Sequence, residues 1–376
     1  MNFNYYFALS LCAFLLSNAG CARIKDNCEA IGSKQPICGT RRPEDMAHIP
    51  NQPMLIISEM GDPTDHGVAG SLSLLNIETK AFTRLYPLDD NKDLPPNSDR
   101  LSVKNNKIWG DPDCPQHTPR ILAPHGIHLS LRSDGDLQLL AVNHGSREAI
   151  EYFQLDLNNG NKSLQWRGCV IPKPATFMNN VVSLADGGFI ATQAFDYEAF
   201  SFGPLNIELI KGILGWNTGY VFEWHPESGF KKVIGGDGRF VNGLALSKDE
   251  KSIYATYYMG HEVRRIDRNT GELLATTRIE EPDNLTWTDD GNLLVASHQG
   301  NLLDKLVCLK VTDAACVFKF GIYQLDPETL SSKEVISHKG PPMGAVTVAK
   351  QVGKHLYLGS YAGNRVMKIS YSSLKR

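Results

Sequence analysis

The sequence predicts an all-β fold, a six-bladed β-propeller of four-stranded antiparallel blades. One pattern of short apolar strands separated by tight turns recurs six times along the 376 residues. Gly (33) and Pro (20) are plentiful, as a turn-rich chain requires. A small antiparallel sheet cannot bury both faces alone, whereas sheets arranged radially cover one another. A two-sheet sandwich or two smaller β domains are the alternatives, and six matched copies favour the propeller.

Each copy is expected to begin with an innermost strand and to continue with two further strands. The innermost strands are predicted at residues 43–50, 124–131, 178–185, 241–248, 282–289 and 342–349. The second strands are predicted at residues 52–61, 136–145, 188–195, 251–258, 292–299 and 354–361. The third strands are predicted at residues 71–78, 149–157, 219–226, 261–267, 320–327 and 365–371. The last copy has only three strands, so the N-terminal segment 24–37 is expected to add the fourth and close the ring.

The chain begins with an apolar run, Tyr5 to Leu16, that is too short to span a bilayer. Small residues follow it, so residues 1–21 are predicted to be a signal peptide and residues 22–376 a single propeller domain. Cys21 also resembles the lipidated cysteine of a bacterial lipoprotein signal, which is the alternative. The protein is therefore expected to be exported, either secreted or periplasmic, or anchored to a membrane through Cys21.

Six cysteines remain once that leader is removed, and an even number suggests disulfides formed in an oxidising compartment. Two pairs would close short local loops and leave two cysteines for a third. The expected pairs are Cys28–Cys38, Cys308–Cys316 and Cys114–Cys169. The spacings match no zinc pattern, and free buried thiols are the alternative.

Two special positions stand just before each innermost apolar strand. The first holds Glu44, His125, Asn179, Asn242, Asp283 and Met343, and the second holds Asp45, Gly126, Asn180, Gly243, Asn284 and Gly344. Because innermost strands line the axis of a propeller, these positions converge on one point. Five of them form a shell of oxygen ligands: Glu44, Asn179, Asn242, Asp283 and Asn284. Calcium fits such a shell best and magnesium second. Capping of the turn before each strand is the alternative role of these Asn and Asp residues. Their shared position in successive copies favours the ligand role.

The second position indicates a further ion. Asp45 and Asn180 could hold a deeper structural calcium together with the backbone carbonyl of Ile127. A buried hydrogen-bonded pair is the alternative.

Two histidines accompany the oxygen shell. His125 takes the axial position in the second copy, and His144 ends the adjacent strand. A histidine pair beside a metal suits water activation and proton relay near neutral pH. His117, His128 and His298 are expected to be structural or peripheral.

Taken in order, these residues resemble the paraoxonase/arylesterase family, within the wider group of senescence-marker-protein, gluconolactonase and luciferin-regenerating-enzyme propellers. The resemblance covers residues 28–371 and rests on Glu44-Asp45, Pro124-His125-Gly126-Ile127, Val142-Asn143-His144, Asn179-Asn180, Asn242-Gly243-Leu244 and Asp283-Asn284. It implies a six-bladed propeller with a catalytic calcium held by the five-residue shell. It also implies a buried structural calcium at Asp45 and Asn180, and a catalytic pair of His125 and His144.

The chain departs from this family in three ways. Asn180 stands where the paraoxonase branch carries an aspartate, which removes a negative charge from the second site. That branch joins the two ends of its chain by a disulfide, whereas no cysteine follows Cys316 here. Residues 89–120 and 195–216 are long loops expected at the rim of the pocket, so substrate preference does not carry over. The apolar segment 195–216 is expected to be a packed flap, a lid, or a contact for a membrane or partner.

The expected reaction is calcium-dependent hydrolysis of lactones or aryl esters, with a calcium-polarised carbonyl and water activated by the histidine pair. Asp283 or Glu44 is the alternative base. A calcium-stabilised binding module and a strictosidine-synthase-like enzyme are the alternative functions, and the complete ligand set argues against both. The formal net charge of −3 argues against a nucleic-acid partner, so a small lactone or ester is the expected partner. The sequence leaves the oligomeric state open.

Overall fold

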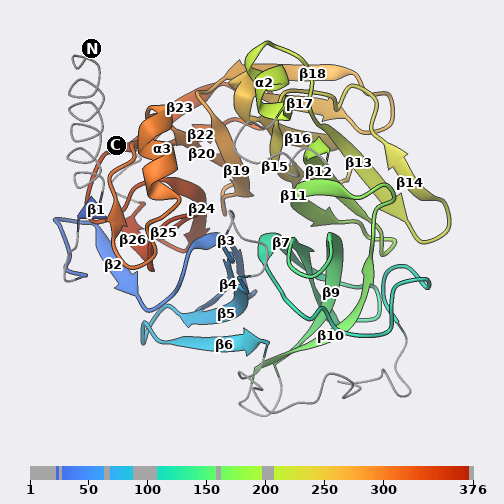
Figure 1. The fold of residues 1–376 in the computed structure, drawn as a ribbon, viewed down its shortest axis with the longest axis horizontal. Helices are drawn as coiled ribbons and strands as arrows, with labels where there is room; N and C mark the ends of the chain where they lie inside the picture. The colour runs from blue at the N-terminus through green and yellow to red at the C-terminus, as the bar shows by residue number, and fades with distance from the viewer. Residues whose placement is uncertain are drawn as a thin grey trace, which may run out of the picture.

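The computed structural model describes residues 23–24, 28–62, 68–87, 108–157, 162–196 and 207–371. They form six four-stranded antiparallel sheets around one axis (Figure 1), which confirms the predicted six-bladed propeller. A further two-stranded sheet pairs β1 (Arg23–Ile24) with β21 (Ala315–Cys316). The expected leader lies outside the described residues, so the leader and the 22–376 domain boundary stay predictions.

The first five blades run outward from the axis in chain order. Blade 1 contains β3 (Pro43–His48), β4 (Met54–Glu59), β5 (Ser71–Asn76) and β6 (Phe82–Tyr86). Blade 2 contains β7 (Pro124–Leu131), β8 (Leu137–Asn143), β9 (Ala149–Asp156) and β10 (Ser163–Val170). Blade 3 contains β11 (Thr176–Ser183), β12 (Phe189–Asp196), β13 (Tyr220–His225) and β14 (Gly229–Lys232). Blade 4 contains β15 (Val241–Leu246), β16 (Ser252–Tyr257), β17 (Glu262–Asp267) and β18 (Leu273–Arg278). Blade 5 contains β19 (Pro282–Trp287), β20 (Leu293–His298), β22 (Phe320–Leu325) and β23 (Ser332–His338).

Blade 6 is built from both ends of the chain. Its inner strands are β24 (Val346–Val352), β25 (His355–Ser360) and β26 (Arg365–Ser370), and its outer strand is β2 (Gln35–Cys38). β2 pairs antiparallel with β26, from Gln35 opposite Lys368 to Cys38 opposite Arg365. The predicted closure of the ring by an N-terminal strand is therefore confirmed.

The hydrophobic core lies between blades rather than at the axis. Separate clusters of buried apolar side chains fill the contact between each blade and the next, such as Leu139, Phe153 and Leu72 between blades 1 and 2. The innermost strands contact one another in the cyclic order β3, β7, β11, β15, β19, β24 and back to β3. Because the apolar side chains occupy the inter-blade spaces, polar residues can line the axis without breaking the core.

All three expected disulfides are present, joining Cys28 to Cys38, Cys114 to Cys169, and Cys308 to Cys316. Two short helices interrupt the strand order, α2 (Ile207–Ile213) after β12 and α3 (Leu302–Cys308) after β20. Among the described residues, no helix has the length and apolar character needed to cross a bilayer.

Candidate functional site

The predicted axial residues fall in β-bulges at the start of the innermost strands. In blades 1 to 5 the pairing of the innermost strand with its neighbour shifts register there, for example between Pro124 and Ile127 and between Pro282 and Leu285. In a regular strand consecutive side chains point to opposite faces, whereas a bulge turns extra residues out of the ladder. The bulges therefore allow neighbouring polar residues, such as Asp283 and Asn284, to serve the same axial region.

Glycine at the second position lets the inner strands approach closely. A Cβ atom on Gly126 would lie 2.7 Å from the backbone oxygen of Asn179, and one on Gly243 would lie 2.4 Å from that of Asp283. Larger residues at these positions would push the blades apart. The axial polar groups are consequently held on tightly packed backbone.

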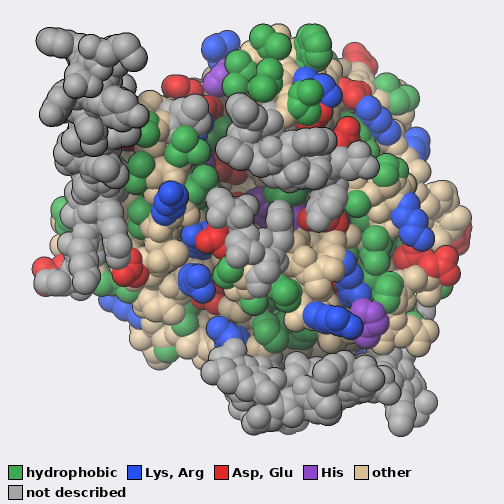
Figure 2. Space-filling model, viewed as in Figure 1, with side chains coloured by type: hydrophobic (Ala, Val, Ile, Leu, Met, Phe, Trp, Pro, Cys, Tyr) green, Lys and Arg blue, Asp and Glu red, His purple; other side chains and the backbone are tan. Residues whose placement is uncertain are grey.

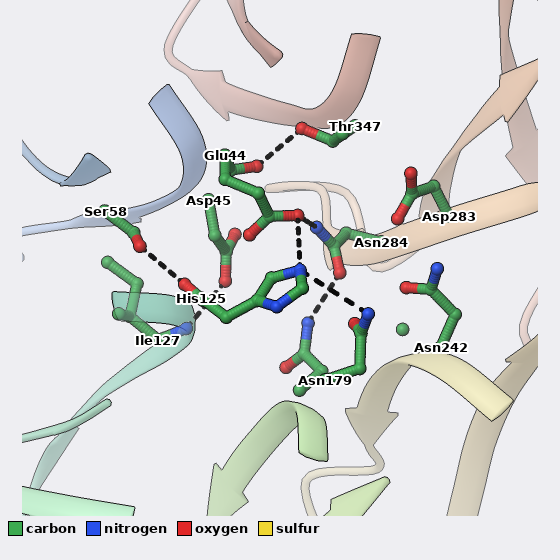
Figure 3. A network of polar contacts seen from close by, with 12 residues as sticks. Glu44, Asp45, Ser58, His125, Ile127, Asn179, Asn242, Asp283, Asn284 and Thr347 are labelled. Atoms are coloured by element: carbon green, nitrogen blue, oxygen red, sulfur yellow. Dashed lines mark hydrogen bonds and ion pairs between the residues drawn. The ribbon is translucent and has the colours of Figure 1, made fainter. Parts of the chain in front are cut away.

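The side chains of five different blades converge at this point (Figure 3). Glu44 comes from β3, His125 from β7, Asn179 from β11, Asn242 from β15, and Asp283 with Asn284 from β19. Asn284 Nδ2 donates to Glu44 Oε1 at 2.9 Å, which joins opposite parts of the ring. Blade 6 contributes the buried Met343 at the equivalent position, and this thioether offers no oxygen ligand.

Three buried oxygens around the axis have no hydrogen-bond partner among the described residues: Glu44 Oε2, Asn179 Oδ1 and Asn242 Oδ1. Leaving a buried oxygen unsatisfied costs about 1–3 kcal/mol, so native proteins rarely tolerate it without a reason. Such oxygens beside the Asp283 carboxyl form the donor set that a hard divalent cation prefers. The residues present therefore fit a cation at the axis.

Burial governs the protonation of the axial carboxyls. It raises the pKa of Glu44 well above the usual range, and the charges of Asp45 and Asp283 raise it further. It likewise raises the pKa of Asp283, against the opposing effect of a hydrogen bond from Asn242. Carboxyls gathered in this way favour a positive partner, because a cation would stabilise their ionised forms.

A cation held by this shell would depend on amide ligands. Within the described part of the chain, no three His, Cys, Asp or Glu side chains gather as a metal site. Asn179, Asn242 and Asn284 complete the shell instead, and amide oxygens are accepted by calcium but are poor ligands for softer metals.

Hydroxyl groups from neighbouring blades fix the axial backbone. Ser58 Oγ donates to the backbone oxygen of His125 at 2.6 Å, and Thr347 Oγ1 donates to that of Glu44 at 2.6 Å. These bonds link blade 1 to blade 2 and blade 6 to blade 1, so His125 and Glu44 are each positioned by two blades.

His125 and His144 form the expected pair, and an unpredicted glutamate extends it. His125 Nδ1 lies 2.9 Å from His144 Nε2, and His144 Nδ1 lies 2.9 Å from both carboxyl oxygens of Glu148. The His144 ring stacks on Phe177, with centroids 4.2 Å apart and planes 6° apart. The only sequence signal for Glu148 was its place four residues after His144, in the loop that follows β8.

This chain of contacts assigns the protons. An ionised Glu148 can only accept, so His144 Nδ1 carries a hydrogen and its Nε2 accepts from His125 Nδ1. His125 Nε2 is then left with a lone pair, 3.6 Å from Glu44 Oε1 and 3.5 Å from Asn179 Nδ2. Burial, and then the neighbouring His144, lower the pKa of His125 well below the usual range. His125 Nε2 consequently faces the axis as an unprotonated nitrogen.

His298 was expected to be structural or peripheral, and it lies beside the axial shell rather than at the periphery. It lies at the end of β20 with Nε2 3.6 Å from Asp283 Oδ2, and that nitrogen has no hydrogen-bond partner. Its Nδ1 lies 2.9 Å from the Tyr258 hydroxyl. Burial, and then the charge of Lys305, lower the pKa of His298 to about 3. A second neutral histidine therefore faces the axial shell from blade 5.

The residues of the second predicted ion site also lie together. Asp45 Oδ2 accepts from the backbone N–H of Ile127 at 2.8 Å, and Asn180 Nδ2 donates to Asn284 Oδ1 at 2.7 Å. Burial raises the pKa of Asp45 to about 6, against the opposing bonds from Ile127 and Met46. These residues border a cavity of about 410 Å³ that follows the innermost strands away from Glu44.

The described part of the apolar segment 195–216 is exposed around α2. Ile213, Leu214 and Trp216 are 70%, 66% and 61% exposed, and Figure 2 shows hydrophobic side chains gathered over this helix. A packed flap is therefore the wrong description of residues 207–216. Contact with a membrane or partner, and a role as a lid, stay predictions.

Known proteins similar to this chain share its architecture. The curated serum paraoxonase/arylesterase 2 of Homo sapiens is 23% identical over 163 residues, 43% of this chain and 44% of that protein. This chain spans about half the length of the curated relatives it matches. A solved luciferin-regenerating enzyme has a TM-score of 0.51 at 14% identity, covering 89% of this chain and 92% of that one. A gluconolactonase from Xanthomonas campestris has a TM-score of 0.50 at 16% identity, covering 93% of both chains.

The solved structures support the propeller fold alone, because their identities are low. The sequence profile of the Arylesterase family is more specific, and it matches residues 43–371. This match runs from the first residue of β3 to the residue after β26, and it includes every axial residue named above. The chain therefore belongs to the arylesterase family.

Proposed function

We propose that this protein hydrolyses carboxylic esters, with lactones and aryl esters as its substrates, and that the axial shell holds one catalytic calcium ion. The observation that carries the proposal is the set of unpartnered buried oxygens on Glu44, Asn179 and Asn242, beside the neutral base His125. Membership of the arylesterase family supports the reaction class. Magnesium is the second choice of ion, because it demands a tighter octahedron and keeps more water.

The residues that would hold the ion are Glu44, Asn179, Asn242, Asp283 and Asn284. When bound there, a divalent cation supplies a Lewis acid that polarises the substrate carbonyl and stabilises the negative charge developing on its oxygen.

The histidine chain supplies the proton transfers. His125 Nε2 removes a proton from the water that attacks the carbonyl carbon. The positive charge this creates is shared with His144 through the 2.9 Å contact and is balanced by Glu148. When the carbon–oxygen bond to the leaving group breaks, His125 returns the proton to the leaving oxygen. His298, on the other side of the shell, is the alternative base, together with the carboxyls of Asp283 and Glu44.

Hydrolysis of a panel of aliphatic lactones and phenyl acetate tests the proposal. We expect the purified full-length protein to lose activity on chelation and to regain it when calcium is added back. A parallel series with magnesium distinguishes the two ions. Calcium binding without hydrolysis would favour a calcium-stabilised binding module, and hydrolysis unaffected by chelation would contradict the catalytic cation.

Glu148→Gln tests the assigned proton chain. We expect kcat to fall about 10- to 100-fold, the usual effect of removing a partner that orients a site residue. The acid limb of the kcat–pH profile should move to lower pH, because the protonated histidine pair loses its carboxylate partner. Glu148→Asp, which keeps the charge, should recover part of the activity. An unchanged kcat and pH profile in Glu148→Gln would show that Glu148 only supports the loop.

We also propose that the protein functions in an oxidising compartment outside the cytoplasm. The three disulfides support this, because such bonds persist where thiols are not kept reduced. Export through the leader 1–21 and anchoring through a lipid on Cys21 are part of the proposal. Mass spectrometry of the mature N-terminus distinguishes a cleaved free terminus from a lipidated Cys21.

A further inference from the structure

The second predicted ion site has a different character from the axial shell. Asp45 Oδ1 and Oδ2 accept from the backbone N–H groups of Met46 and Ile127, both at 2.8 Å. Asn180 Oδ1 accepts from the Val181 N–H at 2.7 Å. All three side-chain oxygens that would face an ion therefore already have donors, whereas Glu44, Asn179 and Asn242 each keep one unpartnered.

A lysine occupies the same cavity. Lys350, on β24, borders the space of about 410 Å³ together with Asp45, Ile127 and Asn180. Burial lowers the pKa of Lys350, and the charges of Asp45 and then Asp289 oppose this shift. Lys350 also lies near enough to His128 for its charge to help keep that buried ring neutral. The side chain of Lys350 thus borders the same cavity as the second predicted ion site, and its charge acts on Asp45.

The side-chain charges around the lower site are less favourable to a divalent ion than those around the axial shell. The axial shell contains two carboxyls, Glu44 and Asp283, beside the neutral rings of His125 and His298, and the charge of Lys305 acts on Asp283. The lower site contains one carboxyl, Asp45, one neutral amide, Asn180, and the cation Lys350. Divalent cations are held by net negative oxygen cages, and a neighbouring ammonium repels them.

We propose that Lys350 takes the place of the second calcium ion, so that the chain holds one divalent cation at the axis and none at Asp45 and Asn180. This inference does not depend on the reaction proposed above. Asp45 links β3 to β7 through Ile127, so an internal ammonium at this position stabilises the contact between blades 1 and 2 without metal. The fold should consequently survive chelation that abolishes activity.

Metal stoichiometry tests the proposal. Purified full-length protein is dialysed against calcium, and bound calcium is counted by mass spectrometry in wild type, Asp283→Asn, and the double variant Asn180→Asp/Lys350→Ser. We expect one equivalent in wild type, none in Asp283→Asn, and two in the double variant. The matched control is Asn180→Asp/Lys248→Ser, which removes a different lysine at the border of the cavity and should keep one equivalent.

Each result separates the two proposals. Two equivalents in wild type, or a single equivalent that survives in Asp283→Asn, would overturn the role given to Lys350. No gain in the folded double variant would also overturn it. No calcium in wild type but one equivalent in the double variant would support Lys350 and reject the axial site. If the double variant does not fold, the wild-type and Asp283→Asn counts still decide the question.

Discussion

Asp283→Asn is expected to abolish calcium binding and ester hydrolysis together. Asp283 is one of two carboxyls in the axial shell, and its replacement keeps the shape while removing a negative charge. Replacing a residue that only supports a metal ligand commonly lowers metal affinity or activity about 10- to 100-fold. Because Asp283 would contact the ion directly, both calcium affinity and kcat/KM should fall by at least about 100-fold. Calorimetric titration with calcium and lactone hydrolysis measure the two effects.

A control variant and one contrary result show whether loss of activity in Asp283→Asn is due to loss of calcium. Asp249→Asn removes an exposed turn carboxyl, 59% exposed, and should leave affinity and activity unchanged. Activity that persists in Asp283→Asn after calcium has been lost would contradict the metal-assisted mechanism. Thermal unfolding of each variant shows whether loss of activity reflects loss of the fold.

His125→Gln is expected to remove hydrolysis while calcium remains bound. General-base catalysis contributes about 100- to 10,000-fold, and glutamine offers hydrogen bonds but cannot take the proton. Because burial lowers the pKa of His125, the base is deprotonated at neutral pH and becomes protonated only under acidic conditions. The wild-type kcat–pH profile should therefore fall on its acid side below the usual range of histidine.

The matched control lies three residues further along β7. His128→Gln changes a buried histidine that hydrogen-bonds Ser183 and borders the lower cavity, so kcat should be unchanged. Full activity in His125→Gln would transfer the role of base to His298 or to an axial carboxyl. The same measurement on His298→Gln then decides between those alternatives.

The ring and its closure could be predicted because they depend on repetition. Six copies of one strand pattern determine the blades, and the missing strand of the last copy indicates β2. The axial residues followed from a shared register before each innermost strand. The bulges that aim Asp283 and Asn284 at one region could not be predicted, because alternation assigns consecutive residues to opposite faces.

Residues outside that register were missed for physical reasons. Glu148 lies in a loop, and its contact with His144 depends on how the loop folds back. His298 stands at the end of the second strand of blade 5, and His144 stands at the equivalent position directly after the second strand of blade 2. Comparing the copies could therefore have identified His298. Lys350 lies on β24, where apolar and polar residues alternate as in any half-buried strand. Its neighbours Asp45, Ile127 and Asn180 are identified only by the cavity that all four residues border.

The composite blade has a consequence for how this protein is made. Because β2 pairs with β26, the ring stays open until β26 has been synthesised. Until then the apolar face of blade 1 that packs against blade 6 is uncovered, and β2 has no partner strand. The seam between the chain ends is therefore the last contact to form and a natural place for unfolding to start.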